Sequence, residues 1–343
     1  MTRAPSRQLS IRCLQAFAAV VALMLPALLW SWATPAPYAD LTRIGRFSEA
    51  SFGWRGSQPA VSAASLQATP IDQADVLVIG DSFSAQRLWQ SVLVEGGWRV
   101  ATWHWNSVDH LCRDLEPWLR RQGYQGHTVV LQVVERHLPS LVDKSRGCST
   151  MPALRATAGK LRTDVPLTHP PEPALNWQAR LDTGAVTAWN NWLAERDDAS
   201  FVVREGEHVR VASVARGCEL FSHRLCRRAL FLADDLDLPP ALPDHVTALP
   251  AIAASTPTLR IVWLVTPNKS TVYLQPERAR QLGAAMRQTV VAQGLGIDLF
   301  GALMERRDTL RDLYFPGDTH LSTAGYLEMG RLVAGALGPA PAR

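Results

Sequence analysis

The stretch ADVLVIG at residues 74–80, followed at once by DSFS at residues 81–84, decides the expected fold. A short apolar run that ends in glycine is typical of a buried strand. Further strands are expected at residues 98–103, 128–134, 259–266 and 296–300, and helices at residues 84–94, 111–121, 276–293 and 323–337. Strands that alternate with helices form parallel βαβ units whose helices cover both faces of a sheet. The sequence therefore predicts an α/β domain over residues 71–340, a three-layer α/β/α sandwich with a parallel sheet.

A long insertion interrupts this alternation between the third and fourth expected strands, at about residues 139–258. Within it, residues 187–196 are expected to be helical, and residues 201–214 alternate like a β-hairpin around Gly206. The segment forms either an insertion on the same domain or a small second domain.

The N-terminus indicates export. Residues 13–33 are uncharged and mostly apolar, and they follow Arg3, Arg7 and Arg12. A helix of this length spans about 30 Å, enough to cross a bilayer, and arginines stay on the cytoplasmic side. A cleaved signal peptide is the alternative to a signal anchor. Residues 34–70 are rich in Pro, Ala and Ser and are expected to be a spacer.

Composition and charge exclude two classes of protein. The chain of 343 residues is 47% hydrophobic and 19% charged, which excludes a disordered chain. Its net charge of +4 includes the three N-terminal arginines, and residues 1–33 hold no acidic residue, so the remainder carries only +1. A nucleic-acid partner needs a larger basic surface, and none is expected.

Cysteine use agrees with an oxidising compartment. Besides Cys13, the chain has Cys112, Cys148, Cys218 and Cys226, which permit two disulfides in any of three connectivities. Cys218 and Cys226 are near in sequence and are expected to close a loop, which leaves Cys112 to pair with Cys148. A zinc site is the alternative, but C-x2-C and H-x3-H spacings are absent. Nucleotide-binding glycine motifs are also absent, so no metal or cofactor is expected.

Ser82 is the candidate nucleophile. It follows the first strand at the carboxyl edge of the sheet, where open α/β sheets build their sites. A serine there can attack an acyl carbonyl if a base removes its proton. The alternative is that Ser82 or Ser84 simply caps the following helix.

The segment FPGDTHLS at residues 315–322 supplies a candidate base before the last helix. His320 can take the proton of a serine, and Asp318 can orient the imidazole and stabilise its charged form. An ordinary surface loop is the alternative interpretation of these two residues. Their pairing with the Gly80-Asp81-Ser82 strand end favours a Ser–His–Asp triad.

These motifs resemble the SGNH (GDSL-like) hydrolase superfamily, which has its nucleophile in a Gly-Asp-Ser turn and its Asp and His in a C-terminal loop. The chain has one residue between Asp318 and His320 where typical members have two, and VVERH at residues 133–137 replaces a G-x-N-D block. Both features, and PNKSTVY at residues 267–273, resemble the polysaccharide O-acetyltransferases AlgJ and AlgX of alginate acetylation. The elements of those proteins are circularly permuted relative to this chain but keep the same cyclic order.

The resemblance implies Ser82, Asp318 and His320 as the catalytic residues, and a polysaccharide as the acetyl acceptor. Further candidates for oxyanion or substrate contacts are Asn106, Arg136, Lys269, Tyr273 and Trp105. Asn106 is expected to join the Ser82 amide as an oxyanion donor. Arg136 either contacts substrate or forms structural ion pairs near Glu135, and Trp105 either stacks on a sugar ring or belongs to the core.

The expected function is O-acetyl transfer to a polysaccharide through an acetyl-serine, by a periplasmic domain anchored in the inner membrane. A membrane-bound partner is expected to supply the acetyl groups. An exported carbohydrate esterase with the same triad is one alternative. A non-catalytic glycan-binding subunit of a secretion complex is the other.

Overall fold

A parallel sheet forms the centre of the computed structural model, which describes residues 7–156, 164–196, 201–205, 207–237 and 242–342. The strands are β1 (Val76–Gly80), β2 (Val100–His104), β3 (Thr128–Val134) and β7 (Arg260–Thr266). Their order is β2-β1-β3-β7, and all pairs are parallel. The predicted α/β class, the parallel sheet and its first four strands are confirmed.

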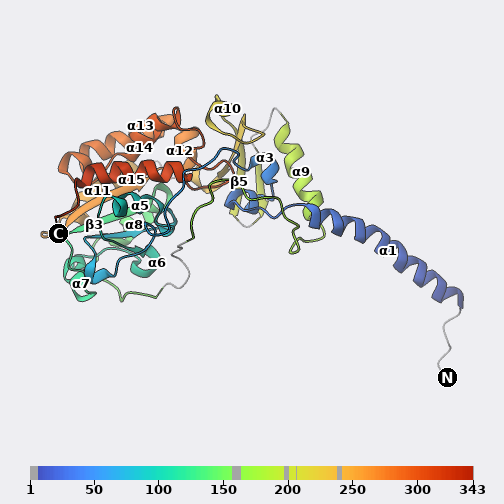
Figure 1. The fold of residues 1–343 in the computed structure, drawn as a ribbon, viewed down its shortest axis with the longest axis horizontal. Helices are drawn as coiled ribbons and strands as arrows, with labels where there is room; N and C mark the ends of the chain where they lie inside the picture. Colours follow the sequence, from blue (N-terminus) through green and yellow to red (C-terminus); the bar gives the residue numbers. More distant parts are fainter. Residues whose placement is uncertain (1–6, 157–163, 197–200, 206, 238–241, 343) are drawn as a thin grey trace, which may run out of the picture.

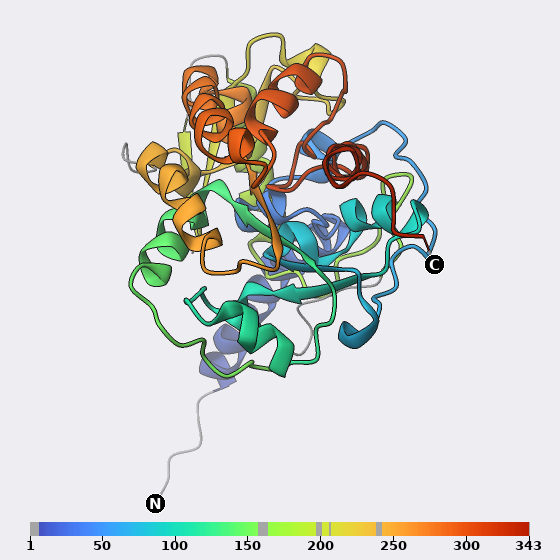
Figure 2. The same ribbon diagram turned by 90° about the vertical axis from the view of Figure 1, so that its left-hand side faces the viewer.

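Helices pack against both faces of this sheet. Along β1, Val76 and Val78 face one apolar core and Leu77 and Ile79 the other, because successive side chains of a strand point to opposite sides. The first core includes α5 (Leu88–Glu95), α14 (Leu299–Arg307) and α15 (Thr323–Leu337). The second includes α7 (Leu115–Arg121), α8 (Leu138–Ser145), α11 (Leu242–Ala253) and α13 (Pro276–Ala285). Figure 2 shows α15 and α7 on opposite sides of the sheet.

The strand order places a topological switch at β1. β2 lies on one side of β1 and β3 on the other, so the connections leaving β1 and β2 run in opposite directions across the sheet. Ligand sites of open α/β sheets form at the carboxyl ends of strands beside such a switch. The residues after Gly80 occupy that place.

Two predicted elements differ from the structure. The expected strand at residues 296–300 is wrong: Gly296 makes a single bridge to Trp263, and α14 begins at Leu299 because Asp298 caps it. The expected helix at residues 84–94 is divided into α4 (Ser82–Ala85) and α5, since Arg87 between them adopts a left-handed conformation with φ 57°.

Shorter elements complete the chain. The helices are α6 (Trp105–Val108), α10 (Gly217–Leu220) and α12 (Lys269–Tyr273). Single turns span Ile71–Gln73, Glu135–His137 and Ala233–Asp235, and α13 continues through a π-helical turn, Met286–Val290, and a 3-10 turn, Val291–Gln293.

The insertion contains a small antiparallel sheet. β4 (Phe201–Glu205) and β5 (Glu207–Ser213) form the predicted hairpin, whose turn residue Gly206 lies outside the described residues. β6 (Arg228–Leu232), which sequence patterns did not indicate, pairs with β5 on the other side. The predicted helix in this segment is α9 (Thr183–Glu195).

Part of the expected spacer is folded into the molecule, which corrects the prediction for residues 34–70. Helices α2 (Asp40–Ile44) and α3 (Glu49–Phe52) pack on the antiparallel sheet. Leu41, Phe47 and Phe52 are buried there with side chains of β5 and β6. The Pro-, Ala- and Ser-rich composition of residues 34–70 led to the prediction of a spacer, although the segment contains these three apolar residues.

The N-terminal helix α1 (Arg7–Ala33) projects away from the folded body (Figure 1). Residues Leu9–Ala33 are long and apolar enough to cross a membrane, and an 18-residue window within them has a mean hydropathy of 2.1 and no buried residue. By length and composition this helix fits a membrane anchor or a signal sequence. Arg3 lies outside the described residues.

Two disulfides are present, Cys112–Cys148 and Cys218–Cys226, which confirms the predicted pairing. Cys13 is a free, exposed cysteine within α1. Disulfides persist in oxidising compartments, so they agree with the export that the apolar helix suggests.

Candidate active site

Ser82 occupies the first position of α4, directly after β1 and the cap residue Asp81. The Asp81 carboxylate accepts the Phe83 amide at 2.9 Å and the Val134 amide at 2.6 Å. The cap of this helix is therefore Asp81, not a serine, and the exposed Ser82 hydroxyl has another hydrogen-bond partner.

A buried polar network fixes the turn beneath Ser82. Gln132 Oε1, on the neighbouring strand β3, accepts the Asp81 amide at 3.0 Å and the Ser84 hydroxyl at 2.8 Å. The Trp89 indole donates to Ser84 Oγ at 3.1 Å. Because buried polar groups cost free energy unless they are paired, this network holds the turn in one conformation.

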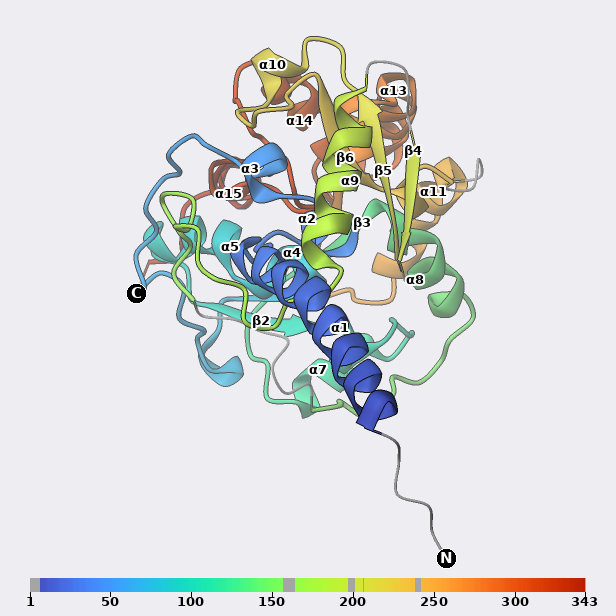
Figure 3. The same ribbon diagram turned by 90° about the vertical axis from the view of Figure 1, so that its right-hand side faces the viewer.

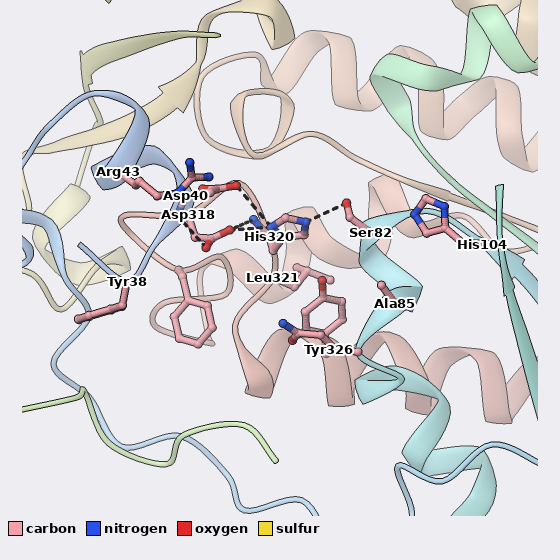
Figure 4. A pocket seen from close by; sticks show the side chains of 12 residues that line it. Tyr38, Asp40, Arg43, Ser82, Ala85, His104, Asp318, His320, Leu321 and Tyr326 are labelled. Atoms are coloured by element: carbon pink, nitrogen blue, oxygen red, sulfur yellow. Dashed lines mark hydrogen bonds and ion pairs between the residues drawn. The ribbon is translucent and has the colours of Figure 1, made fainter. Parts of the chain in front are cut away.

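His320 joins the two ends of the chain at this edge. Its Nε2 lies 2.9 Å from Ser82 Oγ, and its Nδ1 lies 2.7 Å from Asp318 Oδ1 (Figure 4). The His320 amide also donates to Asp318 Oδ1 at 2.9 Å. The structure thus brings the three predicted residues into one hydrogen-bonded chain, with the imidazole between the hydroxyl and the carboxylate.

A second carboxylate, Asp40, lies beside the imidazole. Asp40 Oδ2 is 3.6 Å from His320 Nδ1, and the Asp40 amide donates to Asp318 Oδ2 at 3.2 Å. Thr319 donates to Asp40 through its amide at 2.8 Å and through its hydroxyl at 2.5 Å. Sequence reasoning missed Asp40. The signal that could have found it is the apolar spacing of Leu41 and the residues after it.

The segment that carries Asp40 is hydrogen-bonded to the loop at residues 315–322, which carries His320 and is here called the histidine loop. The amides of Leu41 and Thr42 both donate to the Gly317 carbonyl, at 3.0 and 3.2 Å. The Glu49 carboxylate accepts the Tyr38 amide at 2.9 Å and so anchors the start of the segment. Asp40 is therefore positioned by contacts on both sides of it.

The two carboxylates set the charge of the imidazole. Burial alone would lower the pKa of His320, but the negative charges of Asp318 and Asp40 outweigh it and raise that pKa above its ordinary value. For Asp318, burial is likewise outweighed by the positive imidazole, which holds the pKa of this carboxyl well below its usual range. The two carboxylates therefore stabilise the positive charge that His320 gains when it accepts a proton.

Lys269 supports the histidine loop through hydrogen bonds to its backbone. Its side chain is only 1% exposed, and Nζ donates to the carbonyls of Phe315, Pro316 and Asp318 at 2.9, 2.6 and 3.1 Å. Burial lowers the pKa of Lys269 to about 7, although the nearby Asp318 charge opposes this shift. Lys269 lies at the predicted sheet edge, but it contacts the protein rather than a cavity.

Arg136 belongs to a structural network. Its Nη1 lies 3.3 Å from Asp235 and 3.2 Å from the Asn268 side chain. The adjacent Glu135 is fully buried and accepts Arg278 at 2.7 Å. Since Arg136 lines neither cavity at Ser82, the structure favours the ion-pair interpretation.

Tyr273 and Trp105 are part of the core. The buried Tyr273 hydroxyl accepts the Tyr314 amide at 3.5 Å. Trp105 is 9% exposed, and its indole donates to the Gln132 carbonyl at 2.6 Å. Tyr273 lines neither cavity at Ser82, whereas Trp105, although largely buried, does line one of them, so its predicted stacking on a sugar stays a prediction.

Two cavities lie on either side of Ser82 and share Ser82 and His104. The first, of about 510 Å³, lies beside the N-terminal segment and is lined by Tyr38, Asp40 and Arg43 among others (Figure 4). The second, of about 540 Å³, contains the predicted donor Asn106. Its other lining residues include His137, Ser140 and Lys144.

Two groups of described residues have metal-ligand geometry. Asp40, Asp318 and His320 form one, but their ligand atoms are engaged in the hydrogen bonds given above. His110 and the two cysteines of the Cys112–Cys148 disulfide form the other. A disulfide offers no thiolate, which is the form that binds metal.

Comparison of the chain with protein-family models, with curated proteins and with solved structures finds no match.

Proposed function

We propose that this chain is an exported serine O-acyltransferase that moves acetyl groups onto hydroxyls of a polysaccharide. The observation that carries this proposal is the hydrogen-bonded chain from Ser82 through His320 to Asp318 at the exposed edge of the sheet. An activated serine needs a base within hydrogen-bond reach and a third group that orients the base.

The chemistry begins with proton transfer from Ser82 Oγ to His320 Nε2. The oxygen attacks the acetyl carbonyl and forms a new C–O bond, and the leaving group departs with the proton from the imidazolium. In the second half, a sugar hydroxyl gives its proton to His320 and attacks the carbonyl of the acetyl-serine; the ester bond to Ser82 Oγ then breaks, and the imidazolium returns the proton to that oxygen. The Ser82 amide and the Asn106 side chain are the candidate oxyanion donors, and one such donor is worth about 3 kcal/mol.

The two cavities support transfer between two different molecules. Each opens onto Ser82, so a donor and an acceptor can approach the same oxygen from different sides. Arg43 lines the first cavity, and His137 and Lys144 line the second. Polar side chains of this kind can hydrogen-bond the hydroxyls of a sugar.

The apolar helix α1 and the two disulfides bear on the location of the protein. We propose that α1 stays as an inner-membrane anchor and that the body lies in the periplasm, near a membrane-bound partner that delivers acetyl groups. The apolar length of α1 and the two disulfides support this placement. No nucleic acid and no cofactor is part of the proposed reaction.

We further propose that the body is a three-layer sandwich of the SGNH type. The Gly-Asp-Ser turn after β1 and the Asp318-Thr319-His320 loop before α15 support this relationship. The polysaccharide O-acetyltransferase branch is favoured by the same D-T-H spacing. Lys269 and Tyr273 also match positions of that branch. In the structure Lys269 hydrogen-bonds the histidine loop and Tyr273 is buried in the core.

The test is to incubate the purified full chain with an acetyl ester, with and without oligosaccharides of bacterial exopolysaccharides. Acetylated oligosaccharide that disappears in Ser82→Ala, but not in the exposed control Ser149→Ala, is the expected result. Acetate release that is unchanged by any acceptor would instead identify an esterase. Oligosaccharide binding with no turnover in either form would identify a non-catalytic glycan-binding protein.

A further inference from the structure

Exposed tryptophans gather where α1 meets the folded body. Trp30 near the end of α1 is 51% exposed, and Trp177, Trp189 and Trp192 of the insertion are 68%, 59% and 45% exposed. Large aromatic side chains usually dominate cores and interfaces. Four tryptophans with such high exposure on neighbouring segments indicate a site of interaction with another molecule or with a membrane.

Helix α9 has two distinct faces. Its inner face, which is buried, consists of Gly184, Thr187, Asn190 and Ala194. Its outer face is exposed and apolar, and it consists of Ala185, Ala188, Trp189 and Trp192. The rings of Trp189 and Trp192 stack on each other at 4.9 Å. Within the described residues, no other segment covers this outer face.

The position of α9 beside α1 is fixed by specific contacts. The Ser31 hydroxyl donates to the Leu181 carbonyl at 2.8 Å and accepts the Gly184 amide at 3.1 Å. A Cβ on Gly184 would come within 2.9 Å of the Trp30 ring, so only glycine permits this approach. Figures 1 and 3 show α9 next to the carboxyl end of α1, on the side of the body from which α1 departs.

A second connection runs through the segment before α9. The Asn176 amide donates to the Trp32 carbonyl at 2.8 Å, and the rings of Trp32 and Trp177 lie 5.3 Å apart. The exposed ring of Trp177 is thereby held at the end of the apolar helix. Trp30 and Trp177 beside the end of α1, and Trp189 and Trp192 on the outer face of the adjoining α9, are together named the tryptophan surface.

We propose that the tryptophan surface lies in the headgroup layer of the same bilayer that α1 spans. The folded body would then contact the membrane directly, in addition to being attached to it through α1. Tryptophan favours this layer because its ring is apolar while its N–H can hydrogen-bond. The outer face of α9 carries no charge before Glu195. The Arg196 guanidinium stacks over Trp192 at 4.2 Å, and arginine pairs with phosphate groups.

This inference rests on the proposed retention of α1 as an anchor, but it goes beyond the proposed acyl transfer. It assigns a lipid partner to the insertion, whose residue pattern indicated no function. The contacts between α1 and α9 give the body a fixed orientation relative to α1, and contact of the tryptophan surface with lipid would fix the body relative to the membrane as well.

The test places a spin label on the tryptophan surface of the full chain in nanodiscs of phosphatidylethanolamine and phosphatidylglycerol. Trp189→Cys and Trp192→Cys are labelled in a Cys13→Ser background, and Gln293→Cys, exposed on another part of the body, is the control. We expect the ratio of oxygen to water-soluble nickel accessibility to be several-fold higher at 189 and 192 than at 293. Equal ratios at the three positions would overturn the proposal.

Other occupants give different results in the same experiment. A second copy of the chain would cause dipolar broadening between labels when two copies share a disc, and this would also overturn the proposal. N-terminal sequencing of the membrane-purified chain checks separately that α1 is retained. Since no measurement uses enzymatic activity, failure of the acyl-transfer proposal and failure of the membrane-contact proposal are distinguishable.

Discussion

The serine and the histidine of the candidate site are positioned in contrasting ways. The turn around Ser82 is held by neighbours on β1 and β3 and by its own short helix. The loop around His320 is held by Lys269 after β7 and by the N-terminal segment that carries Asp40. One half of the site depends on the central sheet, and the other depends on segments that converge from distant parts of the chain.

This difference separates two kinds of dependence on mutation. Changes in the serine turn act on a network that is part of the core, so stability and activity should fall together. Changes at the histidine loop act on orientation and charge, so activity should fall more than stability. The following predictions test that separation, beginning with the largest effect.

Asp318→Asn should have the largest effect. It keeps the side-chain shape but removes the charge that holds His320 in the correct tautomer, so kcat should fall about 10⁴-fold. Steady-state kinetics with an acetyl ester measures this loss. The exposed Asp72→Asn should leave kcat unchanged, and a loss below tenfold in Asp318→Asn would argue against a triad.

Lys269→Met should come next. The three loop carbonyls lose their donor, so the free energy of unfolding should fall by about 2 kcal/mol, and a displaced His320 should cost about 100-fold in turnover. Denaturant titration and kinetics measure the two effects. Lys144→Met, which breaks a surface pair with Asp109, should change stability by less than about 1 kcal/mol. Unchanged turnover in Lys269→Met would show that the hydrogen bonds of Lys269 are not needed to position His320.

Gly80→Ala tests the serine half. A Cβ there would overlap the Ser84 hydroxyl and approach Gln132 Oε1 at 2.9 Å, so we expect a loss of about 1–3 kcal/mol in unfolding free energy together with reduced turnover. Gly335→Ala is the matched control, because its Cβ would meet nothing within 4 Å. Thermal and denaturant unfolding compare the two. Equal stability would contradict the close packing of the turn.

Asp40→Asn should have the smallest effect on the maximal rate and a clear effect on its pH dependence. The neutral imidazole is the base, so activity rises as pH rises through the pKa of His320. The Asp40 carboxylate raises that pKa, so its removal should lower the pKa and move the rise in kcat/KM to lower pH. A pH–rate profile measures this. A shift to higher pH, or none, would show that Asp40 does not act on the imidazole.

The sequence predicted the central sheet well because buried parallel strands are continuous apolar runs bounded by turn residues. It also predicted the bounds of α15, Thr323–Leu337, where Ser322 provides a cap. It failed at residues 296–300, because so short a run carries no periodicity and Asp298 instead starts a helix.

The serine and histidine could be predicted because each lies in a compact motif at an element end. The apolar spacing after Asp40 could have indicated that its segment is folded, but not the role of Asp40, which depends on a chain reversal that brings residues 38–42 against Gly317. The roles of Lys269 and Tyr273 were misjudged for a related reason. Position at a sheet edge does not reveal whether a side chain points into a cavity or into the protein.

The short chain between Ala33 and Asp40 limits how far the reaction can take place from the lipid. With α1 as an anchor that ends at Ala33, the seven residues up to Asp40 reach at most about 25 Å when fully extended. On the proposed function, His320 would therefore stay near the bilayer, and only acceptor hydroxyls that pass close to the membrane surface would reach it. If the proposed acceptor is an exported polysaccharide, polymer that has already left the cell envelope would be out of reach, and its acetylation would have to accompany export.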